Sequence, residues 1–330
     1  MFGFSIINTD GKARRGILRT AHGEVPTPVF MPCATYGAVK GITPEQLRSA
    51  GVKMILANAY HLLLRPGVET IVELGGLHKF MGWDGPILTD SGGYQVFSLS
   101  NLRKVTDEAV VFQSHIDGET IELTPEKCIE VQIALGADII MQLDECPPAD
   151  ADEKQVARAV ERTVNWARRC KETWLKSGNP TSQALFAIQQ GGTSLTLREK
   201  CIEALKKLNF PGFAIGGLSV GEKHEEMAAV LETVDDSFPS DKPRYLMGVG
   251  EPRDILLGVS CGIDMFDCVL PTRNARNAQA FTWSGRIRLR NSTYTRDARP
   301  IDEKCPCYTC KNFSRGTLRH YFQILSLIHI

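Results

Sequence analysis

Hydrophobic positions along the chain alternate between short apolar runs and longer amphipathic segments. Short continuous apolar runs are typical of strands buried on both faces, and apolar residues at helical spacing indicate amphipathic helices. The clearest helical segment is Glu153–Lys176, with Val156, Val160 and Val164 on one face. The predicted strands are Val29–Met31, Lys53–Ala57, Pro86–Thr89, Ile139–Leu143, Ala184–Ile188, Gly212–Ile215, Arg244–Met247 and Asp264–Val269, and the further predicted helices are Leu197–Leu208, Glu225–Val234 and Pro252–Cys261.

This alternation predicts an α/β protein built as a parallel (β/α)8 TIM barrel, because strand–helix units recur about every 25–35 residues without a doubly wound glycine fingerprint. Two segments interrupt it and read as hairpin insertions. Val110–Leu123 turns at Asp117-Gly118, and Ala280–Leu289 turns at Ser284-Gly285. Both are pairs of residues that favour tight hairpin turns. A further hairpin is expected at the N-terminus.

Composition is that of a globular protein. Of 330 residues, 43% are hydrophobic and 23% charged, which excludes a disordered chain. No apolar run reaches the roughly 18 residues of a membrane span. The first residues lack a secretion signal, and ten scattered cysteines are typical of reduced thiols. We therefore expect a cytoplasmic protein without membrane contact.

The charge is unevenly distributed although the formal net charge is zero. Residues 272–330 hold 11 Lys and Arg against three acids, so the rest of the chain is acidic. A basic end favours a polyanionic partner. A solvated basic face explains the same pattern equally well.

Three carboxylates stand at or just after the carboxyl ends of predicted strands, where barrel enzymes carry their catalytic groups. They are Asp90, Asp144 and Asp267. Two carboxylates flanking a reacting carbon are what glycosyl transfer requires, one as nucleophile and one as acid/base. Each aspartate alone could instead cap a helix. Together, beside glycine pairs, they favour chemistry.

Glycine-rich turns follow the same strands, at 92–93, 191–192 and 216–217. Glycine permits positive φ and close approach of a ligand to the backbone, although an ordinary turn would explain any one pair. Gly248-Val249-Gly250 occupies the position where barrels often bind phosphate, and the basic stretch 272–276 continues that rim.

A cysteine cluster predicts a metal site near the C-terminus. Cys305, Cys307 and Cys310 offer three thiolates for a structural zinc ion, which normally takes four ligands. His320 and His329 are the histidines that follow.

Several strings together resemble the tRNA-guanine transglycosylases, or queuine tRNA-ribosyltransferases, from about residue 4 to about residue 323. The family's barrel with a zinc-binding subdomain agrees with the pattern described above. The strings are TDSGGYQ (89–95), DEC (144–146), QGG (190–192), GGLSVGE (216–222), GVGEPRD (248–254), FDCVLPTRNAR (266–276) and CPCYTC (305–310).

The resemblance implies exchange of the wobble guanine of a tRNA anticodon. Asp267 would be the nucleophile that holds the ribose covalently, and Asp90 the general acid/base. DEC and SVGE resemble the bacterial branch, whose incoming base is preQ1. A homodimer and one structural Zn²⁺ per subunit are implied too. The implied substrate-binding residues are Asp90, Ser91, Gly92, Gly93, Tyr94, Asp144, Gln190 and Gly217, and the implied RNA-binding residues are Gly248, Val249, Gly250, Glu251, Pro252, Arg253, Asp254, Thr272, Arg273, Asn274, Ala275 and Arg276.

The chain departs from the family at its C-terminus, where relatives continue and supply a histidine as the fourth zinc ligand. We therefore expect an incomplete zinc site held by Cys305, Cys307 and Cys310. The expected domains are a catalytic barrel over 1–275, a truncated zinc-binding and RNA-contacting subdomain over 276–323, and a non-native tail over 324–330.

Two other functions stay open. A catalytically inactive RNA-binding subunit of the same fold would have no need of all three aspartates. A barrel enzyme acting on a small phosphorylated metabolite would not explain the basic end and the cysteine cluster.

Overall fold

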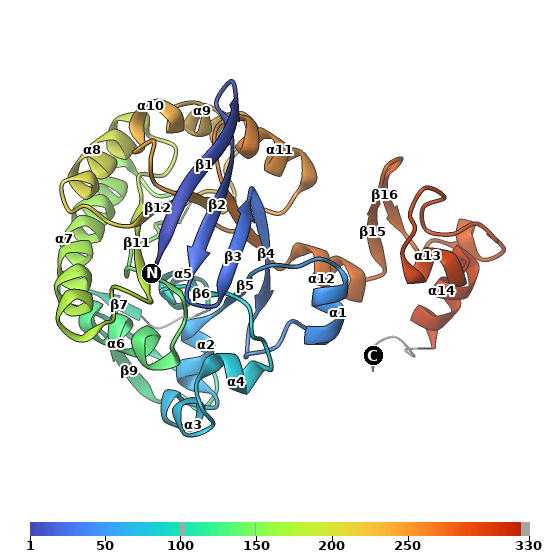
Figure 1. Ribbon diagram of the computed structural model, residues 1–330, viewed down its shortest axis with the longest axis horizontal. Helices are drawn as coiled ribbons and strands as arrows, with labels where there is room; N and C mark the ends of the chain where they lie inside the picture. The colour runs from blue at the N-terminus through green and yellow to red at the C-terminus, as the bar shows by residue number, and fades with distance from the viewer. Residues whose placement is uncertain (100–102, 149, 325–330) are drawn as a thin grey trace. The chain divides into compact units, whose positions relative to one another are not determined.

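The computed structural model describes residues 1–99, 103–148 and 150–324, and the chain folds into two units (Figure 1). The barrel unit comprises residues 1–38 and 44–268, and the C-terminal unit comprises 39–43 and the chain from 269 onward. The predicted domain boundaries, after 275 and after 323, stay predictions. Residues 325–330 of the predicted tail, with His329, lie outside the described residues.

The barrel unit is a closed barrel of eight parallel strands in the order β10-β11-β12-β13-β14-β4-β5-β6. Pairing of β14 with β4 and of β6 with β10 closes the ring. Each predicted strand is present, so the predicted fold class is confirmed. The strands are β4 (Val29–Ala34), β5 (Ile55–Ala57), β6 (Ile87–Thr89), β10 (Ile139–Met141), β11 (Ala184–Gln189), β12 (Gly212–Ile215), β13 (Arg244–Leu246) and β14 (Met265–Cys268).

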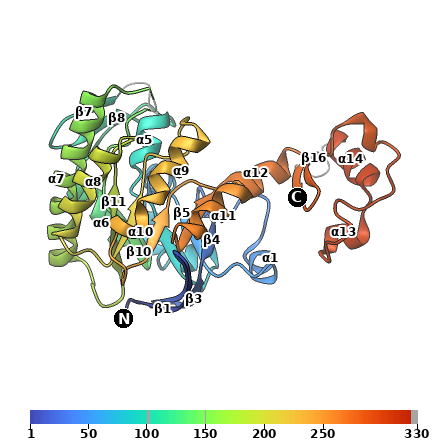
Figure 2. The same cartoon turned by 90° about the horizontal axis from the view of Figure 1, so that it is seen from above.

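Helices cover the outside of the barrel, and α7 and α8 lie side by side there in both views (Figure 1 and Figure 2). The sequence explains α7 well, because Asp152 and Gln155 form a capping box at its start and its apolar face is buried. Thr124 caps α6 with a single hydrogen bond, which it accepts from the backbone N–H of Lys127. The helices of this unit are α1 (Pro44–Ser49), α2 (Ala59–Leu64), α3 (Val68–Glu73), α4 (Leu77–Met81), α5 (Gly93–Leu99), α6 (Pro125–Leu135), α7 (Glu153–Ser177), α8 (Leu195–Lys206), α9 (His224–Glu232), α10 (Val234–Ser237) and α11 (Pro252–Ser260).

Two antiparallel sheets are added to the barrel. The expected N-terminal hairpin is a three-stranded sheet of β1 (Gly3–Asp10), β2 (Ala13–Thr20) and β3 (Gly23–Thr27). The predicted hairpin at 110–123 is formed by β8 (Val110–Gln113) and β9 (Thr120–Leu123), and β7 (Arg103–Val105) extends it to three strands.

The N-terminal sheet is fastened to the amino ends of the barrel strands by Arg14. Its buried guanidinium forms an ion pair with Asp264, which directly precedes β14, and donates to the backbone oxygens of Ser240 (2.7 Å) and Lys242 (2.9 Å). The carboxyl ends of the strands are therefore left for the site.

The C-terminal unit packs around a small core of Ala278, Leu289, Leu318 and Phe322. Its second predicted hairpin is present as β15 (Gln279–Thr282) and β16 (Gly285–Arg288). The unit also contains α12 (Leu270–Arg276), a short 3-10 helix at Ser292–Tyr294, α13 (Tyr308–Asn312) and α14 (Arg315–Gln323). None of the helices described in either unit is long and apolar enough to cross a membrane.

Candidate active site

The three predicted aspartates are buried at the carboxyl ends of their strands. Asp90 directly follows β6, Asp144 follows β10 after a short extension, and Asp267 is the last residue but one of β14. They are 7%, 5% and 8% exposed. Burial raises the pKa of Asp90, and the negative charge of Asp267 adds to that rise.

Asp267 is held in one orientation by donors on two strands. The Tyr245 hydroxyl and the Gly248 backbone N–H both donate to Oδ1, at 2.6 and 2.7 Å. Among the described residues, Oδ2 receives the Cys33 thiol alone, at 3.4 Å. Burial raises the pKa of Asp267, and these hydrogen bonds partly oppose the rise. The weakly bonded Oδ2 is therefore the oxygen best able to attack a carbon atom, because a thiol is a weak donor.

Asp90 is a carboxylate tuned to exchange protons near neutral pH. Burial raises its pKa to about 6, while hydrogen bonds to the charged form limit that rise. The donors are Asn58 Nδ2 (2.6 Å) and Gln95 Nε2 (2.7 Å) on Oδ2, and the Ala59 N–H (2.8 Å) on Oδ1. A group with this pKa can act as both acid and base at physiological pH.

Asp144 stands between two of the other predicted substrate residues. Ser91 Oγ donates to its Oδ1 at 3.1 Å, and Gln190 Nε2 donates to its Oδ2 at 2.7 Å. Burial raises its pKa to about 6 as well. The Oε1 of Gln190 is buried and has no hydrogen-bond partner among the described residues. This oxygen and the carboxylate offer acceptors to a ligand with several N–H groups.

Glycine is required beside these groups. Gly217 has φ +66°, and a Cβ there would collide with Gln190 Oε1. At Gly93 a Cβ would lie 2.9 Å from Asp144 Oδ1. Gly92 has φ +78° and packs against Tyr60. The glycine pairs therefore make room at the site rather than serving only as turns.

Arg198 joins two loops of the site although sequence reasoning did not single it out. It lies on α8, is 1% exposed, and donates to the backbone oxygens of Gly192 (2.6 Å) and Gly216 (2.9 Å) and to Gln189 Oε1 (3.1 Å). Burial lowers its pKa to about 10, which leaves it charged at neutral pH. It fixes the loops that carry Gln190 and Gly217.

The predicted RNA-binding residues fall into both units. In residues 248–254, the Gly248 N–H is used by Asp267, Val249 is buried and Arg253 is exposed. Residues 272–276 belong to α12 of the C-terminal unit, where Arg273 and Arg276 are exposed. Tyr94, on the first turn of α5, is half exposed. The roles of all these residues stay predictions.

The cysteine cluster is preformed. The sulfur atoms of Cys305, Cys307 and Cys310 lie within 4.8 Å of one another, and the group includes no fourth His, Cys, Asp or Glu among the residues that the structure describes. The backbone N–H of Cys310 donates to the Cys307 sulfur at 3.5 Å. Three soft thiolate ligands suit a zinc ion, so the residues present fit such a group.

A second group of potential ligands is better described as a hydrogen-bonded clamp. Both His22 and His78 contact the buried carboxylate of Asp138, at 2.8 and 3.1 Å. Their rings stack at 3.6 Å between centroids with only 19° between planes. An ion bound by both nitrogens would lie well outside at least one ring plane, so this arrangement does not suit a shared metal.

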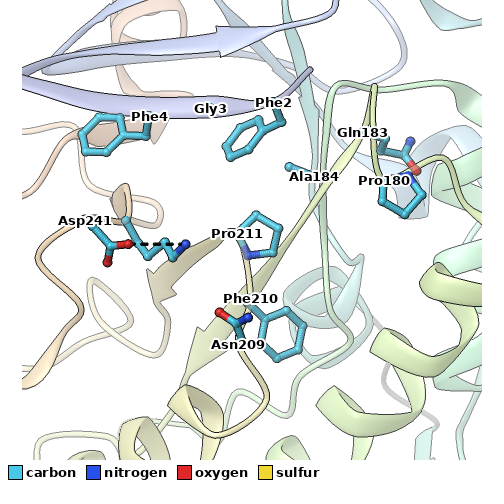
Figure 3. Close-up of a pocket in the computed structure, with 11 residues that line it drawn as sticks. Phe2, Gly3, Phe4, Pro180, Gln183, Ala184, Asn209, Phe210, Pro211 and Asp241 are labelled. Atoms are coloured by element: carbon cyan, nitrogen blue, oxygen red, sulfur yellow. Dashed lines mark ion pairs between the residues drawn. The ribbon is translucent and has the colours of Figure 1, made fainter.

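A separate cavity of about 430 Å³ lies at the amino ends of the barrel strands (Figure 3). Phe2 and Phe4 of the N-terminal segment face Pro211 across it, and Asp241 pairs with Lys242 at 3.6 Å on one side. It is lined by residues that precede β11, β12 and β13, so it is distinct from the site of the three aspartates.

Five residues support the site although the sequence analysis did not predict a role for them. They are Asn58, Gln95, Tyr245, Cys33 and Arg198. Asn58 directly follows β5, so the rule that found Asp90 could have found it. Tyr245 and Cys33 lie within strands whose residues are largely apolar, and Arg198 lies within a helix. Only the closed barrel brings these side chains to the aspartates.

The fold and the tuned carboxylates define an α/β-barrel enzyme. The family described as queuine tRNA-ribosyltransferase matches residues 9–328. A queuine tRNA-ribosyltransferase of Caldanaerobacter subterraneus subsp. tengcongensis is 54% identical over 327 residues, which cover 98% of this chain and 86% of that protein. The queuine tRNA-ribosyltransferase of Halothermothrix orenii is 54% identical, and the match covers 95% of this chain and 83% of that protein. The one of Novosphingobium aromaticivorans is 52% identical, and the match covers 97% of this chain and 86% of that protein. The chain belongs to the queuine tRNA-ribosyltransferase family, which confirms the resemblance.

Proposed function

We propose that the protein exchanges the wobble guanine of a tRNA anticodon for the 7-deazaguanine base preQ1, through a covalent ribosyl-aspartate intermediate. Its family is one of pentosyltransferases that act on tRNA. One observation carries the assignment of the chemistry. A buried Asp267 with one weakly bonded oxygen interacts with a buried Asp90 whose pKa is about 6.

In the first half-reaction, Asp267 Oδ2 attacks C1′ of the target nucleoside and forms an ester bond to the ribose. The bond between C1′ and the guanine nitrogen breaks, and its electron pair leaves with the base. Protonated Asp90 supplies the proton that the departing base takes up. In the second half-reaction Asp90 removes a proton from the incoming base, whose nitrogen attacks C1′ and releases Asp267.

Asp144, Ser91, Gln190 and Gly217 would hold the heterocycle. The free Oε1 of Gln190 and the carboxylate of Asp144 are acceptors for the N–H groups of a guanine-like edge. Gly92 and Gly93 leave space beside them, and the exposed Tyr94 would stack on the ring. Both guanine and preQ1 carry the edge that this set of acceptors fits.

The RNA would enter as a single-stranded loop with its target nucleotide unstacked, because a barrel end cannot receive a paired base. Residues 248–254 and 272–276 would contact the backbone, with Arg273 and Arg276 on phosphates. We also propose that the protein works as a homodimer in the cytoplasm, with the catalytic barrel ending near residue 275.

The cysteine cluster would hold a structural Zn²⁺, one per subunit, through Cys305, Cys307 and Cys310. Bound zinc would supply a cross-link between the turn at 305–307 and α13. A tetrahedral zinc needs a further donor, which would come from outside the three-cysteine group.

Exchange of radiolabelled guanine into tRNA tests the proposal. We expect the label to enter a tRNA with a wobble guanosine and to be released when unlabelled preQ1 is added. A tRNA whose wobble guanosine is replaced by adenosine is the matched control and should take up no label. Equal incorporation into both RNAs would contradict the proposal. RNA binding without any exchange would favour the inactive subunit, for which the relatives, all named as transferases, offer no support.

A further inference from the structure

Two of the three donors that hold Asp90 come from one short segment after β5. Asn58 Nδ2 donates to Oδ2 at 2.6 Å, and the Ala59 N–H donates to Oδ1 at 2.8 Å. Asn58 stands at the N-cap of α2, yet its side chain makes no capping hydrogen bond to that helix. The carboxylate of Asp90 instead accepts from an N–H of the first turn, which has no partner within a helix. The position of this segment therefore decides how well the charged form of Asp90 is stabilised.

Tyr60, the next residue, ties this segment to the loop that carries Asp90. It is 2% exposed. A Cβ at Gly92 would lie 3.1 Å from the Cβ of Tyr60 and 3.3 Å from its backbone nitrogen. The start of α2 and the loop after β6 thus pack closely, without a side chain between them. A displacement of Tyr60 would therefore move the donors beside it relative to Asp90.

The ring of Tyr60 reaches the β8–β9 hairpin. Its hydroxyl shares a hydrogen bond of 3.0 Å with Nδ1 of His115, which lies in the turn between the two strands. The two rings are nearly parallel, with 15° between their planes and 5.7 Å between centroids, and the Phe112 ring of β8 lies 5.5 Å from the Tyr60 ring. Because a hydroxyl can donate or accept, this bond is possible in either protonation state of the imidazole.

The turn between β7 and β8 is fastened to α7. Nε1 of Trp166 donates to the backbone oxygen of Asp107 at 2.8 Å, and Arg162 forms an ion pair of 3.1 Å with the Asp107 carboxylate. Nη1 of Arg169 donates to the backbone oxygens of Asp107 (3.3 Å) and Glu108 (3.0 Å). The hairpin is therefore anchored on the outer helix layer and can serve as a rigid support.

We propose that the β8–β9 hairpin positions the general acid/base of the site. His115 holds the hydroxyl of Tyr60, and Tyr60 keeps the adjoining donors in place against Asp90. Tyr60 and His115 are positioning residues, because both act through Asn58 and Ala59 rather than on the substrate. The inference rests on the proposed function for the role of Asp90, and it gives the inserted hairpin a part in setting the proton affinity of that carboxylate.

The other ionisable groups that interact electrostatically with Asp90 belong to other elements. No hydrogen bond among the described residues joins any of them to Tyr60 or His115. A change at the hairpin therefore alters the proton affinity of Asp90 through its donors. These groups are Asp267 on β14, Tyr245 on β13, Cys33 on β4 and Cys128 on α6.

The pH dependence of unfolding measures the proton affinity of Asp90 without any substrate. The contribution of Asp90 is the difference in free energy of unfolding between a protein and its Asp90→Asn derivative. Because burial raises the pKa of Asp90 from 3.8 to about 6, this contribution falls as the pH rises between those values. In Tyr60→Phe the loosened donors favour the charged form less, so the pKa should rise further and the fall should continue to a pH about one unit higher. His115→Ala, a change at an exposed residue, should have the same effect.

A rescue variant and a matched control separate positioning from a general loss of packing. His115→Asn keeps a polar amide close to the place of Nδ1 and should behave like the unchanged protein. Tyr36→Phe removes the other hydroxyl near His115, which lies 3.4 Å from Nε2. Tyr36 belongs to the loop after β4 rather than to the segment after β5, so this variant should leave the pH dependence unchanged.

Two results would overturn the inference. One is a pH dependence of unfolding that is the same in Tyr60→Phe and in the unchanged protein. The other is a shift in Tyr60→Phe that His115→Ala does not reproduce, because the hairpin would then not be the support.

Guanine exchange distinguishes failure of this inference from failure of the proposed function. Tyr60→Phe and His115→Ala should each lower kcat by about tenfold and leave the KM for tRNA unchanged, because a displaced acid/base slows the chemical steps. An unchanged kcat in both variants, or an unshifted pH dependence of unfolding in an enzyme that exchanges guanine, would overturn the positioning role alone. A shifted pH dependence in a protein that never exchanges guanine would overturn the proposed function alone.

Discussion

The Tyr245 hydroxyl donates a 2.6 Å hydrogen bond to Oδ1 of Asp267, and this contact makes the two oxygens of the carboxylate unequal. Oδ1 carries two strong donors, whereas Oδ2 carries one thiol. The two residues are neighbours because β13 and β14 are paired in register, with Tyr245 opposite Met265. The relationship positions a nucleophile with one oxygen free to react.

Tyr245→Phe should slow formation of the ribosyl-aspartate. Loss of a hydrogen bond to a charged group costs about 1.5–3 kcal/mol, so we expect a 10- to 100-fold lower single-turnover rate. The pKa of Asp267 should rise further, because a bond that favours the charged form is removed. The pH at which adduct formation becomes half-maximal should therefore move upward. An unchanged pH profile would show that Tyr245 does not support the nucleophile.

Asp90→Asn should abolish activity and remove the pH dependence that Asp90 gives to the free energy of unfolding. Because burial raises the pKa of Asp90 from 3.8 to about 6, its contribution to stability is fully present below about pH 4 and is lost as the pH rises through about 6. As the pH rises from about 4 to above 6, the free energy of unfolding of the variant should thus increase by on the order of 2 kcal/mol relative to that of the unchanged protein. Urea unfolding at both ends of the range measures this.

The control for this prediction is Asp84→Asn. The hydrogen bond from Arg48 lowers the pKa of the exposed Asp84, so that variant should not gain stability as the pH rises. If Asp90→Asn and the unchanged protein differed in free energy of unfolding by the same amount at pH 4 and pH 7.5, the raised pKa of Asp90 would be wrong.

Arg198→Met should loosen the loops that hold Gln190 and Gly217. The backbone oxygens of Gly192 and Gly216 would lose their donor in a buried place, at about 1–3 kcal/mol for each group. We expect a clear fall in thermal stability. We also expect the KM for the free base to rise by a larger factor than kcat falls. Lys206→Met, an exposed change on the same helix, should leave both unaffected. Equal behaviour of the two variants would refute a positioning role for Arg198.

Removal of metal should affect the C-terminal unit and spare the barrel. The core of that unit is small, so a structural zinc would contribute much of its stability, whereas the barrel core contains no part of the cysteine cluster. A strong chelator should increase amide hydrogen exchange in residues 300–324 and leave β11 and β12 protected. Retained protection of both regions after complete loss of metal would contradict this.

The barrel could be predicted from the sequence because its strands are buried on both faces. Each of the six residues of β11 is buried, and such runs separated by amphipathic helices indicate one architecture. The positions of Asp90, Asp144 and Asp267 followed from the rule that barrel sites lie at strand ends. Strand limits were less accurate, since β5 begins at Ile55 rather than at Lys53.

The supporting residues could not be predicted, because their importance comes from contacts between distant segments. Cys33 reaches Asp267 across 234 positions of sequence, and Arg198 acts through backbone oxygens that carry no sequence signal. The N-terminal sheet was expected as a hairpin, and its third strand contains Pro26, a residue uncommon in strand interiors.

The most direct test of the account is whether Asp267 becomes covalently attached to RNA. The protein is mixed with substrate tRNA in the absence of a second base and analysed on a denaturing gel. We expect a slower band for the unchanged protein, its loss on addition of excess preQ1, and no such band for Asp267→Asn, which should still bind tRNA. An adduct formed by Asp267→Asn but not by Asp90→Asn would contradict the account and exchange the roles of the two aspartates.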